Sequence, residues 1–413
     1  MAQRHLDPTD PTAAAGPPPV PAGGDALADY LRAQATEFLR ALRLHRESGA
    51  GAHGNGAQSS GSHPSGAHPS GAGALDRGRG RGPAPAPDGP VDAARALRRA
   101  ARRLSGTLHT FQPLLDAEWA EAMRPELAWL SGTLALEHAY ASRLDRLLQA
   151  LHRLSGSAAF PAQQQAGRAA PARAAATADP APVTPLAPSV TRPSPADRGN
   201  LTVGAAKAGA LLDRQLTLAR TRAHSTALQA LGSSRFHAVA DKVALLASDV
   251  PLKDTAAAAA DLRPLAAAAR DRLTDAVAAL PLVTAGNPYN AQALVHGLSP
   301  DPAPHPQDAQ WHQVRLLLRL HRYALEVLAG TDAEDADGAD GTTDVRLLAA
   351  GEALDRHRDA SEAAAAAAQA ARTPRIAPAT AYALGVLHAD QRHEVEAARY
   401  AFQHSWRKEP IRL

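Results

Sequence analysis

Apolar residues recur at every third or fourth position through much of the chain, which is the spacing of one face of an α-helix. The first such stretch contains Leu27, Leu31, Phe38 and Leu42. It follows Asp25, a residue type whose side chain accepts hydrogen bonds from the first turn of a helix. This pattern predicts a helix that ends near Ser48.

Similar patterns predict further helices, separated by breaks at Pro, Gly and Ser. We expect them over about 91–111, 118–130, 134–151, 211–231, 235–249, 262–280, 310–328, 345–371 and 379–406. Strand-like alternation is rare, aromatic residues make up only 4% of the chain, and the abundant Ala, Leu and Arg favour helices. The sequence therefore predicts an all-α fold.

Segments rich in Pro, Gly, Ala and Ser interrupt the helical pattern and lack the apolar residues that a core requires. We predict a disordered tail, a disordered insertion and a disordered linker over 1–24, 49–90 and 155–198. The remaining residues form a helical domain over 25–409, with a first half over 25–154 and a second half over 199–409. Because the two halves have similar numbers of helices, we expect two pseudo-repeated antiparallel bundles.

One predicted helix carries arginines on one side and apolar residues on the other. At about 100° per residue its arginines fall within a sector of about 140°; they are Arg95, Arg98, Arg99, Arg102 and Arg103. Opposite them lie Leu97, Ala101, Leu104, Leu108 and Phe111. A solvated helix face, which is the structural alternative, normally mixes acidic with basic residues, whereas the run 95–103 contains no acid.

A second helix repeats this arrangement with His312, Arg315, Arg319 and Arg322 at positions i, i+3, i+7 and i+10. Its expected buried side consists of Val314, Leu317, Leu318, Leu325 and Leu328. Arginine suits phosphate because its planar guanidinium donates paired hydrogen bonds and stays charged when partly buried. Two such helices in one chain suggest that their basic faces converge on a polyanion.

Charge and composition narrow the possible functions. The chain has 44 Lys and Arg against 41 Asp and Glu, so its net charge is only +3 and the distribution of charge matters more. It has no Cys and no apolar run long enough to cross a membrane, and we expect a cytoplasmic location. We find no Gly-rich phosphate loop, His-x-x-x-His pair or nucleophile motif, and therefore predict a protein that is not an enzyme and needs no metal or cofactor.

Two segments carry a resemblance to a known family. The sequences ARALRRAARRLSGTLHTF, over Ala94–Phe111, and WHQVRLLLRLHRYALEVL, over Trp311–Leu328, resemble the two basic motifs of CHAD domains, the conserved-histidine α-helical domains. The second segment is the closer match. In the first, Arg95 stands where the family has its His.

The resemblance implies a pair of helical bundles whose basic helices line a central groove or pore that binds inorganic polyphosphate without catalysis. Association with polyphosphate granules is a further expectation. The resemblance also implies which side chains bind the phosphates. The better-supported set is Arg95, Arg98, Arg102, Arg103, His312, Arg315, Arg319 and Arg322, with Arg143, Arg146, Arg214 and Arg222 as further candidates.

Two alternatives stay open. Arg-rich helices and the Arg-Gly run at Arg77–Arg81 would also suit the backbone of RNA. The departures from the family motif would suit a degenerate scaffold that no longer binds phosphate.

Overall fold

The computed structural model describes residues 23–54, 90–156, 195–253, 261–286, 305–329 and 345–407. The disorder predicted for the tail, the insertion and the linker falls mostly outside these ranges, as does the run Arg77–Arg81. Outside the described ranges those predictions stay predictions, whereas residues 49–54 and 195–198 are helical.

Every regular element in the described ranges is helical, which confirms the predicted all-α fold. The first α-helices are α1 (Gly23–Gly54), α2 (Pro90–Thr110), α3 (Ala117–Gly156), α4 (Pro195–Leu231), α5 (Ser234–Ser248) and α6 (Arg263–Ala278). They are followed by α7 (Leu282–Ala285), α9 (Ala309–Leu328), α10 (Val345–Ala371) and α11 (Pro378–Arg407). Two 3-10 turns, η1 (Gln112–Leu114) and η2 (Pro306–Asp308), precede α3 and α9.

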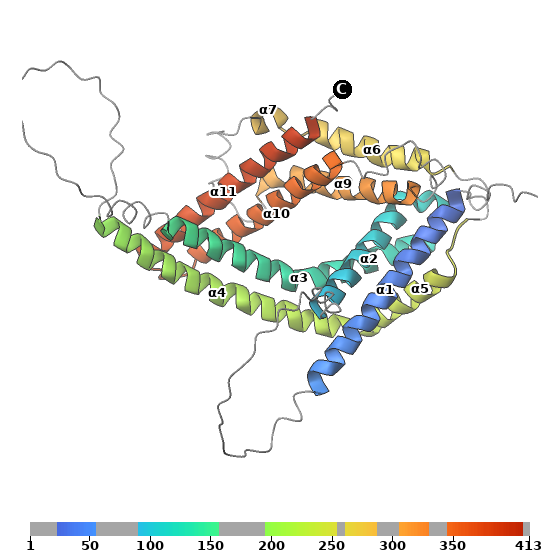
Figure 1. Cartoon of the computed structure of the whole chain (residues 1–413), viewed down its shortest axis with the longest axis horizontal. Coiled ribbons are helices and arrows are strands. Elements are labelled where there is room, and N and C mark those ends of the chain that lie inside the picture. Colours follow the sequence, from blue (N-terminus) through green and yellow to red (C-terminus); the bar gives the residue numbers. More distant parts are fainter. Residues whose placement is uncertain are drawn as a thin grey trace, which may run out of the picture.

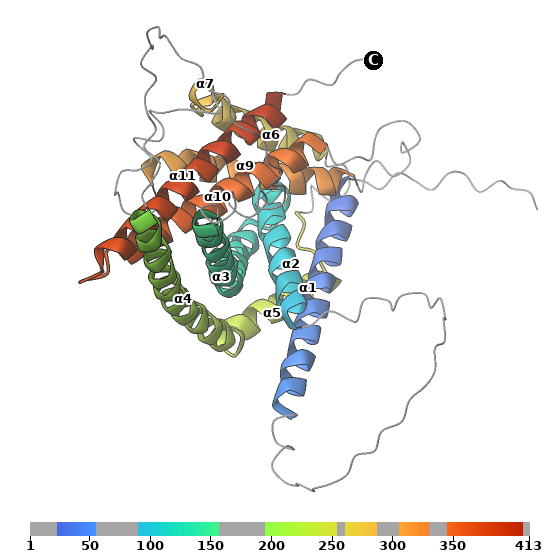
Figure 2. The ribbon, with the colours of Figure 1, turned by 60° about the vertical axis from the view of Figure 1, so that its left-hand side comes forward.

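The helices follow one another in a ring-like arrangement around a central region (Figures 1 and 2). The long helices α3 and α4 pack side by side, and α11 packs against both α10 and α4. Helices α1, α2 and α5 form the part of the molecule drawn at the right of Figure 1. Helix α9 contacts α2, α6 and α10, so it joins the N-terminal helices to the C-terminal ones.

The apolar face predicted for α2 is buried as expected. Leu97, Ala101, Leu104, Leu108 and Phe111 all belong to a core that α2 shares with α1, α5 and the N-terminal part of α3. On α9 the prediction was wrong for Leu325, which is exposed, while the neighbouring Ala324 is fully buried. Val314 and Leu318 are buried as predicted, so the difference is confined to the C-terminal part of α9, where Ala324 and Val327 join the core of α1, α2 and α5.

Of two further cores, one mixes the predicted halves and the other lies within the second half. One combines the C-terminal part of α3 with α4, α10 and α11, and the other combines α6, α7, α9, α10 and α11. The core formed by α1, α2, α5 and the N-terminal part of α3 also includes Ala324 and Val327 of α9. The halves thus share two of the three apolar cores, and a pseudo-repeat within them stays a prediction.

Three predicted helix boundaries differ from the structure. Helix α4 begins at Pro195, inside the predicted linker and well before its expected start near residue 211. Helix α1 continues past Ser48 to Gly54, into the predicted insertion. The helices expected over 118–130 and 134–151 are one continuous helix, α3. The polar residues between them do not break it, because Ser131 is buried and the Thr133 hydroxyl donates a hydrogen bond of 3.0 Å to the carbonyl oxygen of Trp129.

A buried ionic cluster fixes the start of α9 against α10 and α11. The carboxylate of Asp308, in η2, accepts hydrogen bonds from Arg392 Nη1 at 2.8 Å and Arg399 Nη2 at 2.6 Å. It also accepts one from the Ser361 hydroxyl, and His357 Nε2 lies 3.6 Å from Asp308 Oδ1. Burial opposes ionisation of Asp308, but hydrogen bonds from His357 and Arg392 outweigh it and hold the pKa far below the usual range.

Within the described ranges, no helix combines the length and the apolar character that a membrane span would require.

Candidate anion-binding site

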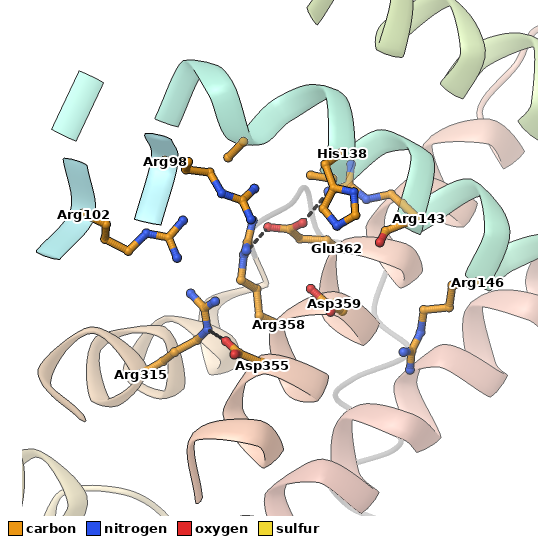
Figure 3. Close-up of a pocket in the computed structure, with 13 residues that line it drawn as sticks. Arg98, Arg102, His138, Arg143, Arg146, Arg315, Asp355, Arg358, Asp359 and Glu362 are labelled. Atoms are coloured by element: carbon orange, nitrogen blue, oxygen red, sulfur yellow. Dashed lines mark hydrogen bonds and ion pairs between the residues drawn. The ribbon is translucent and has the colours of Figure 1, made fainter. Parts of the chain in front are cut away.

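Helices α2, α3, α9 and α10 border a polar cavity of about 310 Å³ (Figure 3). Its lining includes six arginines, which are Arg98 and Arg102 of α2, Arg143 and Arg146 of α3, Arg315 of α9 and Arg358 of α10. Three carboxylates also line it, and all come from α10: Asp355, Asp359 and Glu362. The excess of guanidinium groups over carboxylates leaves the cavity positively charged.

The α2 arginines are the least compensated charges in the cavity. Neither Arg98 nor Arg102 forms an ion pair or side-chain hydrogen bond with another described residue, and Arg98 Nε is buried. Burial lowers the pKa of Arg98 to about 10, and repulsion from Arg102, Arg95 and Arg358 contributes further. Burial also lowers the pKa of Arg102. Both groups stay charged at neutral pH, so a bound anion would relieve their mutual repulsion.

The arginines on the other walls are partly neutralised. Arg315 pairs with Asp355, and Arg143 pairs with Glu362. Glu362 also accepts a hydrogen bond of 2.8 Å from Arg358 Nε. Asp355, Asp359 and Glu362 follow at intervals of four and three residues, so they lie on one face of α10. Figure 3 shows these pairs, of which Arg358–Glu362 lies within α10.

Arg146 and Asp359 are the remaining charged groups of the cavity lining. Arg146 is held toward α11, where its Nε donates to Gln391 Oε1 at 2.7 Å and its Nη2 lies 3.7 Å from Glu394. Burial raises the pKa of Asp359, which Arg358 counteracts and the neighbouring Asp355 reinforces. Asp359 therefore takes up a proton at a higher pH than an ordinary aspartate.

Arg319 and Arg322 lie on the same helix as Arg315 but do not line the cavity. Burial lowers the pKa of Arg319 to about 10, with repulsion from Arg315 and Arg102, so its charge lies beside theirs. Arg322 packs along α10, where an added Cβ on Gly351 would lie 3.6 Å from its Nη1. The Nε atoms of both arginines are buried without a hydrogen-bond partner among the described residues.

His312 is also not placed on the cavity wall. Its ring lies edge-on to His357, with the ring centroids 5.6 Å apart, next to the buried Asp308 cluster. Burial lowers its pKa, so the imidazole is neutral at physiological pH. His312 thus lies apart from the arginines of the cavity wall, and its role in phosphate binding stays a prediction.

Arg95 and Arg103 do not line the cavity, and each is paired with a carboxylate elsewhere. Arg95 Nη1 pairs with Asp92 Oδ1 at 3.1 Å in its own helix. Arg103 Nε pairs with Glu326 Oε2 of α9 at 2.8 Å, and the Tyr30 hydroxyl of α1 donates to the same oxygen at 2.9 Å. Arg103 thus connects α2 to α9.

Arg214 and Arg222 are exposed on α4, which does not border the cavity. They are separated from it because α3 lies between the cavity and α4.

Sequence reasoning missed the α10 wall entirely. Arg358 and the three carboxylates occur in a stretch of mixed charge followed by alanines, which reads as an ordinary solvated helix. Only the packing of α10 against α3 and α9 turns this face inward. Within the described ranges, no three His, Asp or Glu side chains are arranged to hold a metal ion.

Comparison with known proteins identifies the family. A family model described as the CHAD domain matches residues 84–368. Among solved structures, the chain is similar to PptA from Streptomyces chartreusis, with 60% identity, coverage of 94% of this chain and 100% of that chain, and a TM-score of 0.65. A search of curated proteins gives no match. Because the family model spans well over half of the sequence, the chain belongs to the CHAD domain family.

Proposed function

We propose that this protein binds inorganic polyphosphate in the arginine-lined cavity without cleaving or transferring it. The observation that carries the proposal is the pair Arg98 and Arg102, two partly buried guanidinium groups on the wall with no counter-ion among the described residues. Membership of the CHAD family supports the choice of ligand, since the resemblance of its basic motifs implies polyphosphate binding.

A phosphate chain suits the chemistry of this cavity. Each phosphate offers oxygens that accept paired hydrogen bonds from one guanidinium, and successive phosphates repeat the same charge along the chain. Arginines from four helices can therefore contact successive phosphates of one ligand. The α10 carboxylates would compete with the phosphates for Arg315, Arg143 and Arg358, so the α2 wall is the expected point of first contact.

The non-enzymatic part of the proposal is supported by the side chains that line the cavity. Hydrolysis or transfer of a phosphoryl group needs a positioned nucleophile or an activated water. The lining carboxylates Asp355 and Glu362 are already paired with arginines, which favours a role in charge balance. Attachment to polyphosphate granules in the cytoplasm would follow from binding alone.

The test is a calorimetric titration of the purified full-length chain with polyphosphate of defined length at several salt concentrations. We expect the double variant Arg98→Gln/Arg102→Gln to bind on the order of 100-fold more weakly, because two charge-assisted contacts are lost. The matched control is Arg214→Gln/Arg222→Gln, which removes the same charge from the exposed face of α4 and should change affinity by less than about twofold.

The stability of the cavity variant serves as an internal check. Since Arg98 and Arg102 repel each other, their replacement should leave the thermal unfolding midpoint unchanged or higher. No binding by the wild-type protein, even at low salt, would reject the proposal and favour a degenerate scaffold. Displacement of polyphosphate by single-stranded RNA at similar concentration would favour an RNA-binding protein.

A further inference from the structure

A second hollow of about 250 Å³ adjoins the arginine-lined cavity on the other side of α3. It lies between α2, α3 and α4, with His45 of α1 at its edge. Its apolar lining consists of Ala94, Leu134, Ala141, Ala227, Leu228 and Leu231. Apolar surface predominates here, in contrast to the first cavity.

The two hollows share part of their lining. Arg98 and His138 border both of them, so these side chains stand between the apolar hollow and the basic cavity. Along α2, Arg95 borders the apolar hollow, Arg98 borders both, and Arg102 borders the basic cavity. A row of cations therefore runs from one hollow into the other.

Polar groups in the apolar hollow are only partly satisfied. His45 Nδ1 and Arg98 Nε are buried without a hydrogen-bond partner among the described residues. Glu137 is held at the rim by His224 Nδ1 at 2.9 Å and by Arg220 Nε at 3.8 Å. Burial and the neighbouring Arg95 lower the pKa of His138, so its ring is neutral and can stack against a flat ligand.

A bare phosphate chain gains nothing from an apolar wall, because its surface is entirely charged. A ligand that carries an aromatic ring on a phosphate chain would use both hollows. We propose that the apolar hollow binds the base of a nucleoside polyphosphate whose phosphates reach past Arg98 into the basic cavity. This inference rests on the proposed function, because it assigns the same arginines to the phosphates.

The experiment compares ATP, inorganic tripolyphosphate and adenosine by calorimetry on the full-length protein. ATP should bind about tenfold more tightly than tripolyphosphate although it carries less charge, because burial of the base adds to the phosphate contacts. Tripolyphosphate should displace ATP, and adenosine alone should bind weakly. Arg98→Gln should weaken both ATP and tripolyphosphate, since both use the shared arginine.

A matched pair of variants on α4 locates the base. Leu228 lines the hollow and is 53% exposed, whereas Leu218 lies ten residues earlier on the same helix, is 50% exposed and does not line it. Leu228→Glu should weaken ATP binding about tenfold and leave tripolyphosphate nearly unchanged. Leu218→Glu adds the same charge and should affect neither ligand.

The outcomes separate the inference from the proposed function. If polyphosphate and tripolyphosphate both fail to bind, the proposed function is wrong, and the inference fails with it. If they bind but ATP is no tighter than tripolyphosphate, or if Leu228→Glu and Leu218→Glu behave alike, only the inference is overturned.

Discussion

The direction of each arginine on α2 follows from its angle around the helix. Arg98 and Arg102 differ by four residues and project to nearly the same side, which faces the cavity. Arg103 is rotated by about 100° from Arg102 and meets Glu326 of α9 instead. The sequence revealed the basic sector correctly, but the positions of α9 and α10 determine which part of that sector faces an anion.

The ion pairs between α10 and other helices could not be predicted either, because their partners are distant in the sequence. Glu362 pairs with Arg143, which is 219 residues away in the sequence. No local pattern indicates such a partner. The same limit applies to His312, whose match to a family motif gave no sign that its ring would turn toward His357.

Removal of one α10 carboxylate should strengthen anion binding. Glu362→Gln would free Arg143 and Arg358 for phosphate and raise the net charge of the cavity. We expect polyphosphate affinity to increase about fivefold, a moderate effect because the pair is partly solvated. Titration calorimetry measures it, with Glu352→Gln as the control, since Glu352 is exposed on α10 outside the cavity. An unchanged or weaker affinity for Glu362→Gln would show that this carboxylate does not compete with the ligand.

At the scale of elements, the helices themselves were predictable from their apolar periodicity, whereas their junctions were less so. The fusion of two expected helices into α3 is an example, because Thr133 bonds its hydroxyl to the carbonyl oxygen of Trp129 within the helix and leaves the backbone pattern intact. How closely two helices approach each other was not predictable. That distance depends on single small residues at their contacts.

Gly106 sets the approach of α2 to α9. A Cβ at this position would lie 2.6 Å from Cδ2 of Tyr323, which is too close for any van der Waals contact. Gly106→Ala should therefore displace α9 from α2 and lower the free energy of unfolding by about 1–3 kcal/mol. Urea denaturation followed by circular dichroism measures the change.

The matched control has the opposite expected sign. Gly132 is also inside a helix, α3, but an added Cβ there meets no atom within 4 Å. Gly132→Ala should stabilise the protein by up to about 1 kcal/mol, because Ala favours the helix over Gly. Equal effects of the two substitutions would contradict a specific contact between Gly106 and Tyr323.

For the whole molecule, the buried cluster around Asp308 makes stability depend on pH. Burial lowers the pKa of His357 from 6.5 to about 4, despite its contact with Asp308. Between these values the unfolded chain binds a proton that the folded chain does not, so the free energy of unfolding falls as the pH falls. Asp308 also lowers the free energy of unfolding as the pH falls, but only in stronger acid. There the unfolded chain protonates this carboxylate while the folded chain, in which its pKa is lowered, does not.

Chemical denaturation at pH 7, 5.5 and 4 tests this dependence. The wild-type protein should lose stability steadily across this range, and His357→Gln should lose less, whatever its stability at pH 7. His152→Gln removes an exposed histidine and should keep the wild-type profile. A profile of His357→Gln that is as steep as that of the wild type would exclude His357 as the titrating group.

The sharing of apolar cores between the two halves has a consequence for assembly. The cavity takes α2 and α3 from the first half and α9 and α10 from the second. Produced as separate polypeptides, residues 1–175 and 176–413 should each fail to fold alone and should form a one-to-one complex when mixed, as size-exclusion chromatography would show. Since the anion site exists only in that complex, polyphosphate would bind the complex alone and so strengthen the association of the two pieces.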